Sequence, residues 1–312
     1  MAGHWLFRID WGDHPITAGR LVYLLKTKFS NGLRVAYFRD EVRPRILTQP
    51  PLDLPVDRSC EIHVLTSADD WLNLVWALRT FQKASGRNYA LCIHDDGTLK
   101  AETIDSLRAA FPFARIISRS EADQRAAELL APFPRCRKLR ATNKLSLKVL
   151  DFPAFLDAER MILLDSDVLF FSKPTALLAA LDDPCFTQNT LNRDWREGYT
   201  IDLAATRPLL DFDCPAFINS GLGLIHKASL RLEWIENFLA LPGIDSHSHQ
   251  IEQTLIALCS AKFGFRMLPA VYDVHPGPRK TDAPSRHYAG PMRPLMYEEG
   301  IRELAEKGFL NR

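Results

Sequence analysis

Two aspartates separated by one serine are the residues best suited to chemistry in this sequence. Asp165, Ser166 and Asp167 follow the apolar run from Met161 to Leu164 and precede a second apolar run, VLFF. Carboxylates this close repel each other beside apolar neighbours, and a divalent cation between them removes the repulsion. Mg²⁺ and Mn²⁺ bind carboxylates and leave coordination positions open for phosphate oxygens. The pattern predicts a Mn²⁺ or Mg²⁺ site, and the competing interpretation is a turn with capping carboxylates.

A second group of candidate residues lies near the C-terminus, in the segment SRHYAGPMRP. The imidazole of His287 suits Mn²⁺ as a third ligand beside two carboxylates. Gly290 lets the backbone approach a diphosphate closely, and Arg293 can clamp phosphate oxygens with its forked guanidinium. A histidine beside Tyr288 is, by itself, more typical of a packed or surface residue. Together with the aspartates, it favours a metal and diphosphate site.

The elements that must position these residues alternate between apolar strands and amphipathic helices from Cys60 onward. This alternation implies right-handed crossovers and a mostly parallel sheet, in which ligands sit at the carboxyl ends of strands. We therefore predict an α/β fold with a mostly parallel, twisted sheet flanked by helices, and a site among the strand-end sequences TSADD, HDDG and DSD. The predicted strands are residues 61–67, 89–95, 114–118 and 161–164, and the predicted helices are 68–85, 103–111 and 121–131.

Two familiar phosphate-binding patterns are absent from the sequence. It contains neither GxGxxG nor GxxxxGK[ST], so any phosphate is held by another device. The formal net charge of +1 gives no reason to expect a nucleic acid partner. Locally, the stretch from Arg135 to Lys148 is basic without any acidic residue. It is either a solvated helix face or a surface that faces anions or a membrane.

The two candidate groups resemble the metal and diphosphate motifs of glycosyltransferase family eight. The match rests on DSD after a buried strand and on HYAGPMRP, where the family pattern is HxxGxxKPW. Arg293 replaces the lysine of that pattern and Leu295 replaces the tryptophan. The resemblance implies a GT-A fold, a retaining reaction, and Asp165, Asp167 and His287 as the metal ligands.

Three further segments are similar to that family in the same order. PAFINSGLGLIHK places Asn219 and Gly221 against the donor sugar, HQIEQTLIALC supplies Glu252 in place of the usual aspartate, and Gln253 keeps the amide. NKLSLKVLDF implies Lys144 near the sugar and pyrophosphate. Their plain alternatives are a glycine-bearing buried strand, a helix N-terminus and a solvated lysine.

The first predicted strand end completes the implied donor site. Ser67, Ala68 and Asp69 match the segment that holds the uridine base and ribose. The resemblance thus implies metal-dependent transfer of a hexose from a nucleotide diphosphate sugar, expected to be UDP-linked. Within it, Asn219, Glu252 and Gln253 form the catalytic group, and the donor-binding residues are Ser67, Ala68, Asp69, Lys144, Ser166, Gly221, Gly290 and Arg293.

Several functional questions stay open at this stage. The acceptor is a saccharide, a lipid-linked molecule or a protein, and the oligomeric state is not predicted. Retention rests on the resemblance, because an inverting enzyme would need a placed Asp or Glu base. The alternatives are a haloacid dehalogenase-like phosphatase with Asp165 as nucleophile, and a non-catalytic sugar-nucleotide-binding module.

The rest of the chain suggests an N-terminal extension, residues 1–58, before a GT-A domain of residues 59–312. The extension contains a predicted strand pair, RLVYLLKTKF–NG–LRVAYF, and a proline-rich linker, RPRILTQPPLDLP. Residues 182–214 are interpreted as an acceptor-side lid, with Trp195 and Tyr199 available to stack on sugar, or as an ordinary surface loop.

Cysteine usage and hydropathy indicate the compartment. The six cysteines form no CxxC pair, which favours reduced, mostly buried thiols and a cytoplasmic protein. The N-terminus has no apolar signal-peptide region, and no apolar run approaches the ~18 residues of a membrane span. Peripheral contact with the inner membrane face stays open. We interpret HDDG as a turn, and His247 and His249 as loop residues.

Overall fold

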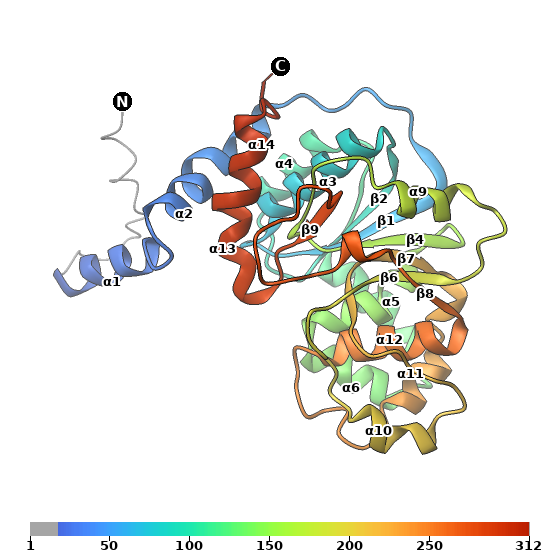
Figure 1. Ribbon diagram of the computed structural model, residues 1–312. Coiled ribbons are helices and arrows are strands. Elements are labelled where there is room, and N and C mark those ends of the chain that lie inside the picture. Colours follow the sequence, from blue (N-terminus) through green and yellow to red (C-terminus); the bar gives the residue numbers. More distant parts are fainter. Residues whose placement is uncertain (1–17, 312) are drawn as a thin grey trace. The chain divides into compact units, whose positions relative to one another are not determined.

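Strand β4 occupies the middle of a seven-stranded sheet in the computed structural model, which describes residues 18–311 (Figure 1). The strand order is β3-β2-β1-β4-β7-β6-β8, and all neighbours are parallel except β7, which is antiparallel to both β4 and β6. The predicted mostly parallel α/β sheet is confirmed. Its strands are β1 (Asp57–Thr66), β2 (Tyr89–Asp95), β3 (Arg115–Ile117), β4 (Arg160–Leu164), β6 (Asn189–Arg193), β7 (Ile218–His226) and β8 (Phe265–Met267).

Helices follow the strands as the sequence pattern predicts. Helix α3 ends at Gly86, whose positive φ of 66° is a conformation that glycine adopts without strain. Helix α4 ends just before Phe111 and Pro112. The helices around the sheet are α3 (Trp71–Ser85), α4 (Ala101–Ala110), α5 (Arg119–Leu129), α6 (Pro134–Thr142), α7 (Leu147–Leu150), α8 (Phe152–Phe155), α9 (Thr175–Asp182), α10 (Leu203–Thr206), α11 (Leu232–Phe238) and α12 (Ile251–Phe263), with 3-10 turns η4 (Lys144–Ser146), η5 (Arg207–Leu209), η6 (Lys227–Ser229) and η7 (Ala270–Tyr272).

Helices cover both faces of this sheet. Figure 1 shows α3 and α4 on one side and α5, α6, α11 and α12 on the other. On the second side, Met161 and Leu163 of β4 pack with Ile225 of β7, Phe238 of α11 and Leu255 of α12 in one buried core. Burying this apolar surface fixes the strand ends on which the candidate residues lie.

A separate two-stranded antiparallel sheet joins distant parts of the chain. It consists of β5 (Val168–Phe170) and β9 (Ser285–His287). Because β5 starts one residue after Asp167 and β9 ends at His287, this small sheet connects the two motifs that the sequence analysis singled out.

The described residues group into two compact units, Pro51–His287 and the segments before and after it. In the second unit the predicted strand pair is wrong, because Asn31 and Gly32 separate two helices instead of turning a hairpin. The proline-rich stretch begins as a 3-10 helix with Pro44 at its start. The residues that follow this helix, 49–56, have neither helix nor strand. The boundary predicted at residue 58 stays a prediction. The helices of this unit are α1 (Ala18–Lys28), α2 (Leu33–Tyr37), η2 (Phe38–Val42), η3 (Arg43–Thr48), η8 (Gly290–Met292), α13 (Arg293–Leu295), η9 (Met296–Ile301) and α14 (Arg302–Glu306).

Residues 182–214 are not simply a lid or loop, because they contain strand β6 of the central sheet. The strand is hidden in the sequence by its polar residues. Asn189 is fully buried, and its amide donates to the hydroxyls of Ser229 and Ser260. Tyr199 is also buried, with its hydroxyl donating to the Pro215 carbonyl, so it is not available to stack on sugar; Trp195 is exposed.

The remaining sequence expectations have mixed outcomes. All six cysteines are free, and four are buried. No helix among residues 18–311 is long and apolar enough to cross a membrane. The basic stretch divides: Arg137 and Lys138 are exposed, whereas Arg140 is buried and donates to Asp151 at 2.7 Å. Neither interpretation of that stretch therefore describes all of it. The expected turn at HDDG is only partly correct, because His94 and Asp95 end strand β2 and the chain bends at Gly97, whose N–H donates to Asp95. His247 and His249 lie in a loop.

Candidate metal and donor site

The β5–β9 ladder brings His287 beside the two aspartates. Asp165 follows β4 directly, and its backbone N–H donates to the Gly221 carbonyl on the neighbouring strand β7. The chain then turns into β5, where Val168 pairs with His287 of β9. A histidine far along the sequence is thereby fixed by backbone pairing next to Asp167.

Asp165, Asp167 and His287 form a compact ligand set. One ligand atom from each lies within 4.8 Å of the others. The Nε2 atom of His287 is 3.0 Å from an oxygen of Asp167 and 3.7 Å from an oxygen of Asp165. Asp167 and His287 are buried, while the Asp165 side chain keeps 21% of its surface exposed. Two carboxylates and one imidazole suit a divalent ion such as Mn²⁺ or Mg²⁺, with access from the side of Asp165.

Asn219 orients the imidazole ring. Nδ1 of His287 lies 2.8 Å from the side-chain oxygen of Asn219, which also accepts the Gly221 N–H. An amide oxygen can only accept, so Nδ1 carries a proton and Nε2 faces the carboxylates. A metal-binding histidine commonly donates its other ring N–H in this way. Burial alone would lower the pKa of His287, but the contact with Asp167 raises it above its usual value.

Lys148 is the site residue that sequence reasoning missed. Its ammonium group lies 2.5 Å from Asp165 and 3.7 Å from Glu252, and its side chain is buried. Burial alone would lower the pKa of Lys148, yet Asp165 and Glu252 raise it above its usual value. A cation therefore already neutralises these carboxylates. The available signal was the basic stretch, but a buried lysine and a solvated one look alike in sequence.

Glu252 and Gln253 begin helix α12 behind the aspartates. Glu252 accepts from the Ser220 hydroxyl at 3.2 Å, and burial raises its pKa to about 7 despite the opposing charge of Lys148. The Gln253 oxygen faces Asn219 and the Ser220 N–H, and its amide donates to the Gly198 carbonyl. The structure therefore brings Asn219, Glu252 and Gln253 together beside the three candidate metal ligands.

Asp194 is a second polar residue that the sequence analysis did not single out. Its carboxylate accepts from the Asn219 amide at 2.9 Å, and its side chain is partly exposed. It follows the unrecognised strand β6, so no strand-end argument pointed to it.

The ends of β1 and β2 form a separate polar group. The Ala68 N–H donates to the Thr98 hydroxyl, which donates to Asp96. Lys144 pairs with the same Asp96 at 2.9 Å and is 58% exposed. Lys144 thus lies near the Ser67–Asp69 segment, whereas Lys148 lies next to the candidate metal ligand Asp165.

The remaining predicted residues are distributed as follows. Ser166 is buried between the two aspartates, and Gly221 lies against His287. Gly290, with a positive φ of 55°, and Arg293 belong to the other compact unit. Their place in the donor site stays a prediction.

Comparison with known proteins supports the fold. No protein-family model matches the sequence, and no curated protein matches it. Among solved structures, the galactosyltransferase LgtC with donor and acceptor sugar analogues is similar at a TM-score of 0.53 and 17% identity, covering 79% of this chain and 95% of that chain. An active-site mutant of LgtC gives a TM-score of 0.55 with the same identity and coverage. The chain has the GT-A glycosyltransferase fold, as the resemblance predicted.

Proposed function

We propose that this protein is a metal-dependent glycosyltransferase that transfers a hexose from a UDP-linked sugar, with retention, to an acceptor of unidentified class. The observation that carries the proposal is the convergence of Asp165, Asp167 and His287 beside the end of β4. The GT-A fold supports it, since LgtC with that fold was solved with donor and acceptor sugar analogues.

Asp165, Asp167 and Nε2 of His287 would hold Mn²⁺ or Mg²⁺. When bound, the ion stabilises the negative charge that develops on the leaving diphosphate. Asn219 fixes the proton of His287 on Nδ1, so the lone pair of Nε2 would be available to bind the ion. Lys148 reduces the repulsion between Asp165 and Glu252 and adds a positive charge to the same place.

The polar groups around the ligand set would orient the donor. Asn219, Glu252 and Gln253 would hold sugar hydroxyls so that the anomeric carbon is exposed. Ser67, Ala68 and Asp69, with Lys144 and Asp96 beside them, would hold the nucleoside. Among the other donor-binding residues, Ser166 and Gly221 would line the diphosphate site, and Gly290 and Arg293 would bind the diphosphate.

Retention needs a route for the acceptor proton. In a front-face reaction, the leaving phosphate takes this proton, so no separate catalytic base is required. Glu252 or Gln253 on the opposite face of the sugar is the alternative. A pKa of about 7 leaves Glu252 partly protonated at neutral pH, so it is poorly suited to act as the charged nucleophile of a covalent route. This favours the front-face route.

Calorimetry of UDP binding, with and without Mn²⁺, tests the proposal. We expect binding to require Mn²⁺ in the natural chain and to be lost in Asp165→Asn and Asp167→Asn, with the fold kept. Equal affinity with and without Mn²⁺ would refute the metal assignment.

Turnover assays then separate the alternatives. Transfer or hydrolysis of a UDP-hexose supports the enzyme. Hydrolysis of a phosphomonoester that depends on Asp165 would instead indicate the phosphatase. Metal-dependent UDP binding without turnover across a broad acceptor panel would indicate a non-catalytic module.

A further inference from the structure

A second cluster of side chains that could bind a metal ion is buried in the sheet, separate from Asp165 and Asp167. His63 of β1 pairs in register with Cys92 of β2, and His94 lies two residues further along β2. Side chains two residues apart on a strand point to the same face, so the three groups converge. All three are almost completely buried, with at most 1% exposed.

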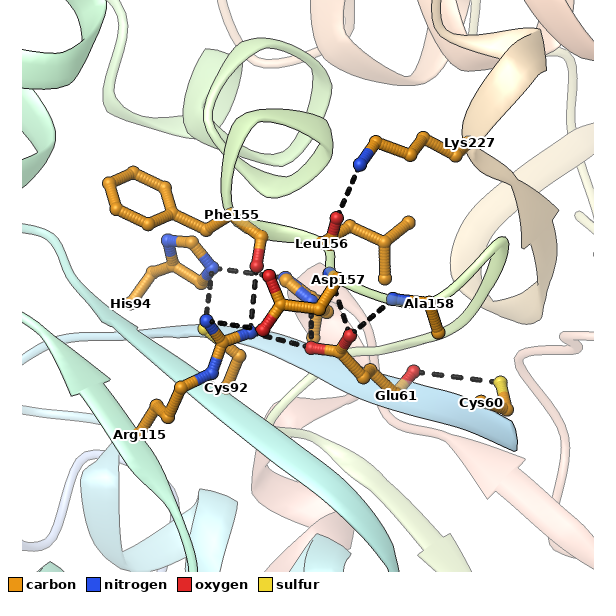
Figure 2. Close-up of polar contacts among 11 residues, drawn as sticks. Cys60, Glu61, Cys92, His94, Arg115, Phe155, Leu156, Asp157, Ala158 and Lys227 are labelled. Atoms are coloured by element: carbon orange, nitrogen blue, oxygen red, sulfur yellow. Dashed lines mark hydrogen bonds and ion pairs between the residues drawn. The ribbon is translucent and has the colours of Figure 1, made fainter. Parts of the chain in front are cut away.

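The three side chains lie under an aromatic cover from α8. The ring of His94 is 4.5 Å from that of Phe152 and 5.7 Å from that of Phe155, measured between centroids. Figure 2 shows Cys92 and His94 close to Glu61 and Arg115. The cluster is thus closed on one side by rings and bordered on the other by charged groups.

Nε2 of His94 has two close neighbours, and a single hydrogen cannot serve both contacts well. Nε2 of His94 lies 3.1 Å from Nδ1 of His63 and 3.4 Å from the sulfur of Cys92. Nε2 of His63 faces the Glu61 carboxylate at 3.3 Å, so in a neutral ring the proton is on that nitrogen and Nδ1 has a lone pair. If His94 donates to Nδ1, the Cys92 thiol cannot donate to His94. If Cys92 donates, two nitrogen lone pairs face each other.

A cation would engage all three lone pairs at once. Each residue offers one ligand atom, and these atoms lie within 4.8 Å of one another. Bonds of about 2.0 Å to nitrogen and about 2.3 Å to sulfur would separate the ligand atoms by about 3.3–3.5 Å in tetrahedral geometry. The shorter observed separations already approach this range, so modest side-chain movement completes the site.

The surroundings of His63 match those of a metal-binding histidine. Glu61 accepts from its Nε2 side, while the other Glu61 oxygen accepts the backbone N–H groups of Asp157 and Ala158 at 2.7 Å. Arg115 donates to Glu61 at 2.7 Å and also pairs with Asp157. A carboxylate held in this way fixes the ring and directs Nδ1 toward the cluster.

We propose that His63, Cys92 and His94 bind a thiophilic d10 metal ion, Zn²⁺ or Cu⁺, at a second site. Sulfur and imidazole ligands select these ions over Mg²⁺, whereas two carboxylates and an imidazole at the first site do not. The thiolate is the form of cysteine that binds a metal, so binding releases the Cys92 proton to solvent. The site would tie β1 and β2 together.

Cobalt spectroscopy of the full chain tests the proposal. Co²⁺ is used as the probe because a cobalt–thiolate bond gives a near-ultraviolet charge-transfer band that carboxylate and imidazole ligands do not give. We expect the band to reach its full intensity at one equivalent of Co²⁺ in the unmutated chain, after a chelator has removed any bound metal. The band should be kept in Asp167→Asn and lost in Cys92→Ser and His94→Gln.

Cys60→Ser is the matched control, since Cys60 is equally buried on β1 but lies outside the cluster. It should keep the band. Circular dichroism checks the fold of each variant. No charge-transfer band in the folded natural chain, or a band unchanged in folded Cys92→Ser, would overturn the site.

Two retention experiments test whether Zn²⁺ and Cu⁺ stay bound at this site. The natural chain is loaded separately with Zn²⁺ and Cu⁺, dialysed, and its metal content measured. We expect one equivalent of either ion to remain, to be absent in Cys92→Ser, and to raise Tm only where it remains. Loss of both ions on dialysis from the natural chain would contradict the proposal.

Discussion

Gly221 on β7 lies directly against the imidazole of His287 on β9. A Cβ atom at position 221 would be 2.2 Å from Cε1 of that ring and 2.4 Å from Nδ1. The same residue donates its N–H to Asn219 and accepts the N–H of Asp165. Gly221 therefore contacts both halves of the ligand set, and only a residue without a side chain fits there.

Gly221→Ala should displace His287 and weaken Mn²⁺-dependent UDP binding while the sheet stays folded. We expect a loss of roughly tenfold to a hundredfold, comparable to disturbing the support of a metal ligand. Calorimetry measures this affinity. Gly277→Ala is the control, because the nearest atom to its added Cβ would be 3.7 Å away. Unchanged affinity in Gly221→Ala would show that His287 is not a ligand.

Asn219→Leu should weaken Mn²⁺ and UDP binding because His287 loses the acceptor that fixes its proton on Nδ1. The expected loss is again about tenfold or more. Asp194→Asn tests the proposed contact of Asn219 with the sugar separately, because Asp194 accepts from the amide nitrogen of Asn219, whereas the amide oxygen of Asn219 faces His287. It should alter binding of a UDP-hexose and leave binding of UDP intact. Equal losses of UDP affinity in both variants would contradict the distinction.

Lys148→Met should destabilise the metal-free chain, because it leaves Asp165 and Glu252 without their buried cation. Removing one partner of a buried ion pair costs about 3 kcal/mol or more. Urea unfolding in the presence of a chelator measures the change, and Mn²⁺ with UDP should recover part of it. Lys144→Met removes an exposed lysine and should cost less than about 1 kcal/mol. Similar losses in both variants would argue against the central position of Lys148.

Glu252 should make stability depend on pH. Burial raises its pKa from 4.5 to about 7. A group with a raised folded-state pKa stabilises the fold while it is protonated, below the unfolded value, and this contribution is lost as pH rises through the folded value. As the pH rises from the unfolded pKa of 4.5 to the folded pKa of about 7, we expect the unfolding free energy of the metal-free chain to fall by at most about 3 kcal/mol.

Glu252→Gln should flatten that part of the pH profile, because the amide does not ionise. Urea unfolding at pH 5 and pH 8 compares the two chains, and Glu233→Gln is an exposed control. An equally steep fall in Glu252→Gln would place the titrating group elsewhere.

The parallel half of the fold could be predicted from sequence because its strands are short apolar runs followed by helical spacing. β6 could not, since Asn189, Thr190 and Asn192 are polar and their burial depends on partners elsewhere in the chain. The N-terminal strand pair was wrong because the Asn31–Gly32 dipeptide also separates helices. Local turn signals do not decide between these outcomes.

The candidate site was predictable where chemistry is visible in residue type. Asp165 and Asp167 were indicated by the mutual repulsion of two adjacent carboxylates, and His287 by the suitability of its imidazole as a third ligand and by the resemblance. Their meeting depends on β5 and β9, which have three residues each and no detectable periodicity. Lys148 was missed because its burial follows from the packing of α7.

Anomalous diffraction from crystals of the chain grown with Mn²⁺ and UDP tests the central claim most directly. We predict a manganese peak about 2.2 Å from oxygens of Asp165 and Asp167 and from Nε2 of His287, with the diphosphate completing the coordination. Bound UDP without manganese at these three residues, or manganese bound elsewhere, would contradict the account.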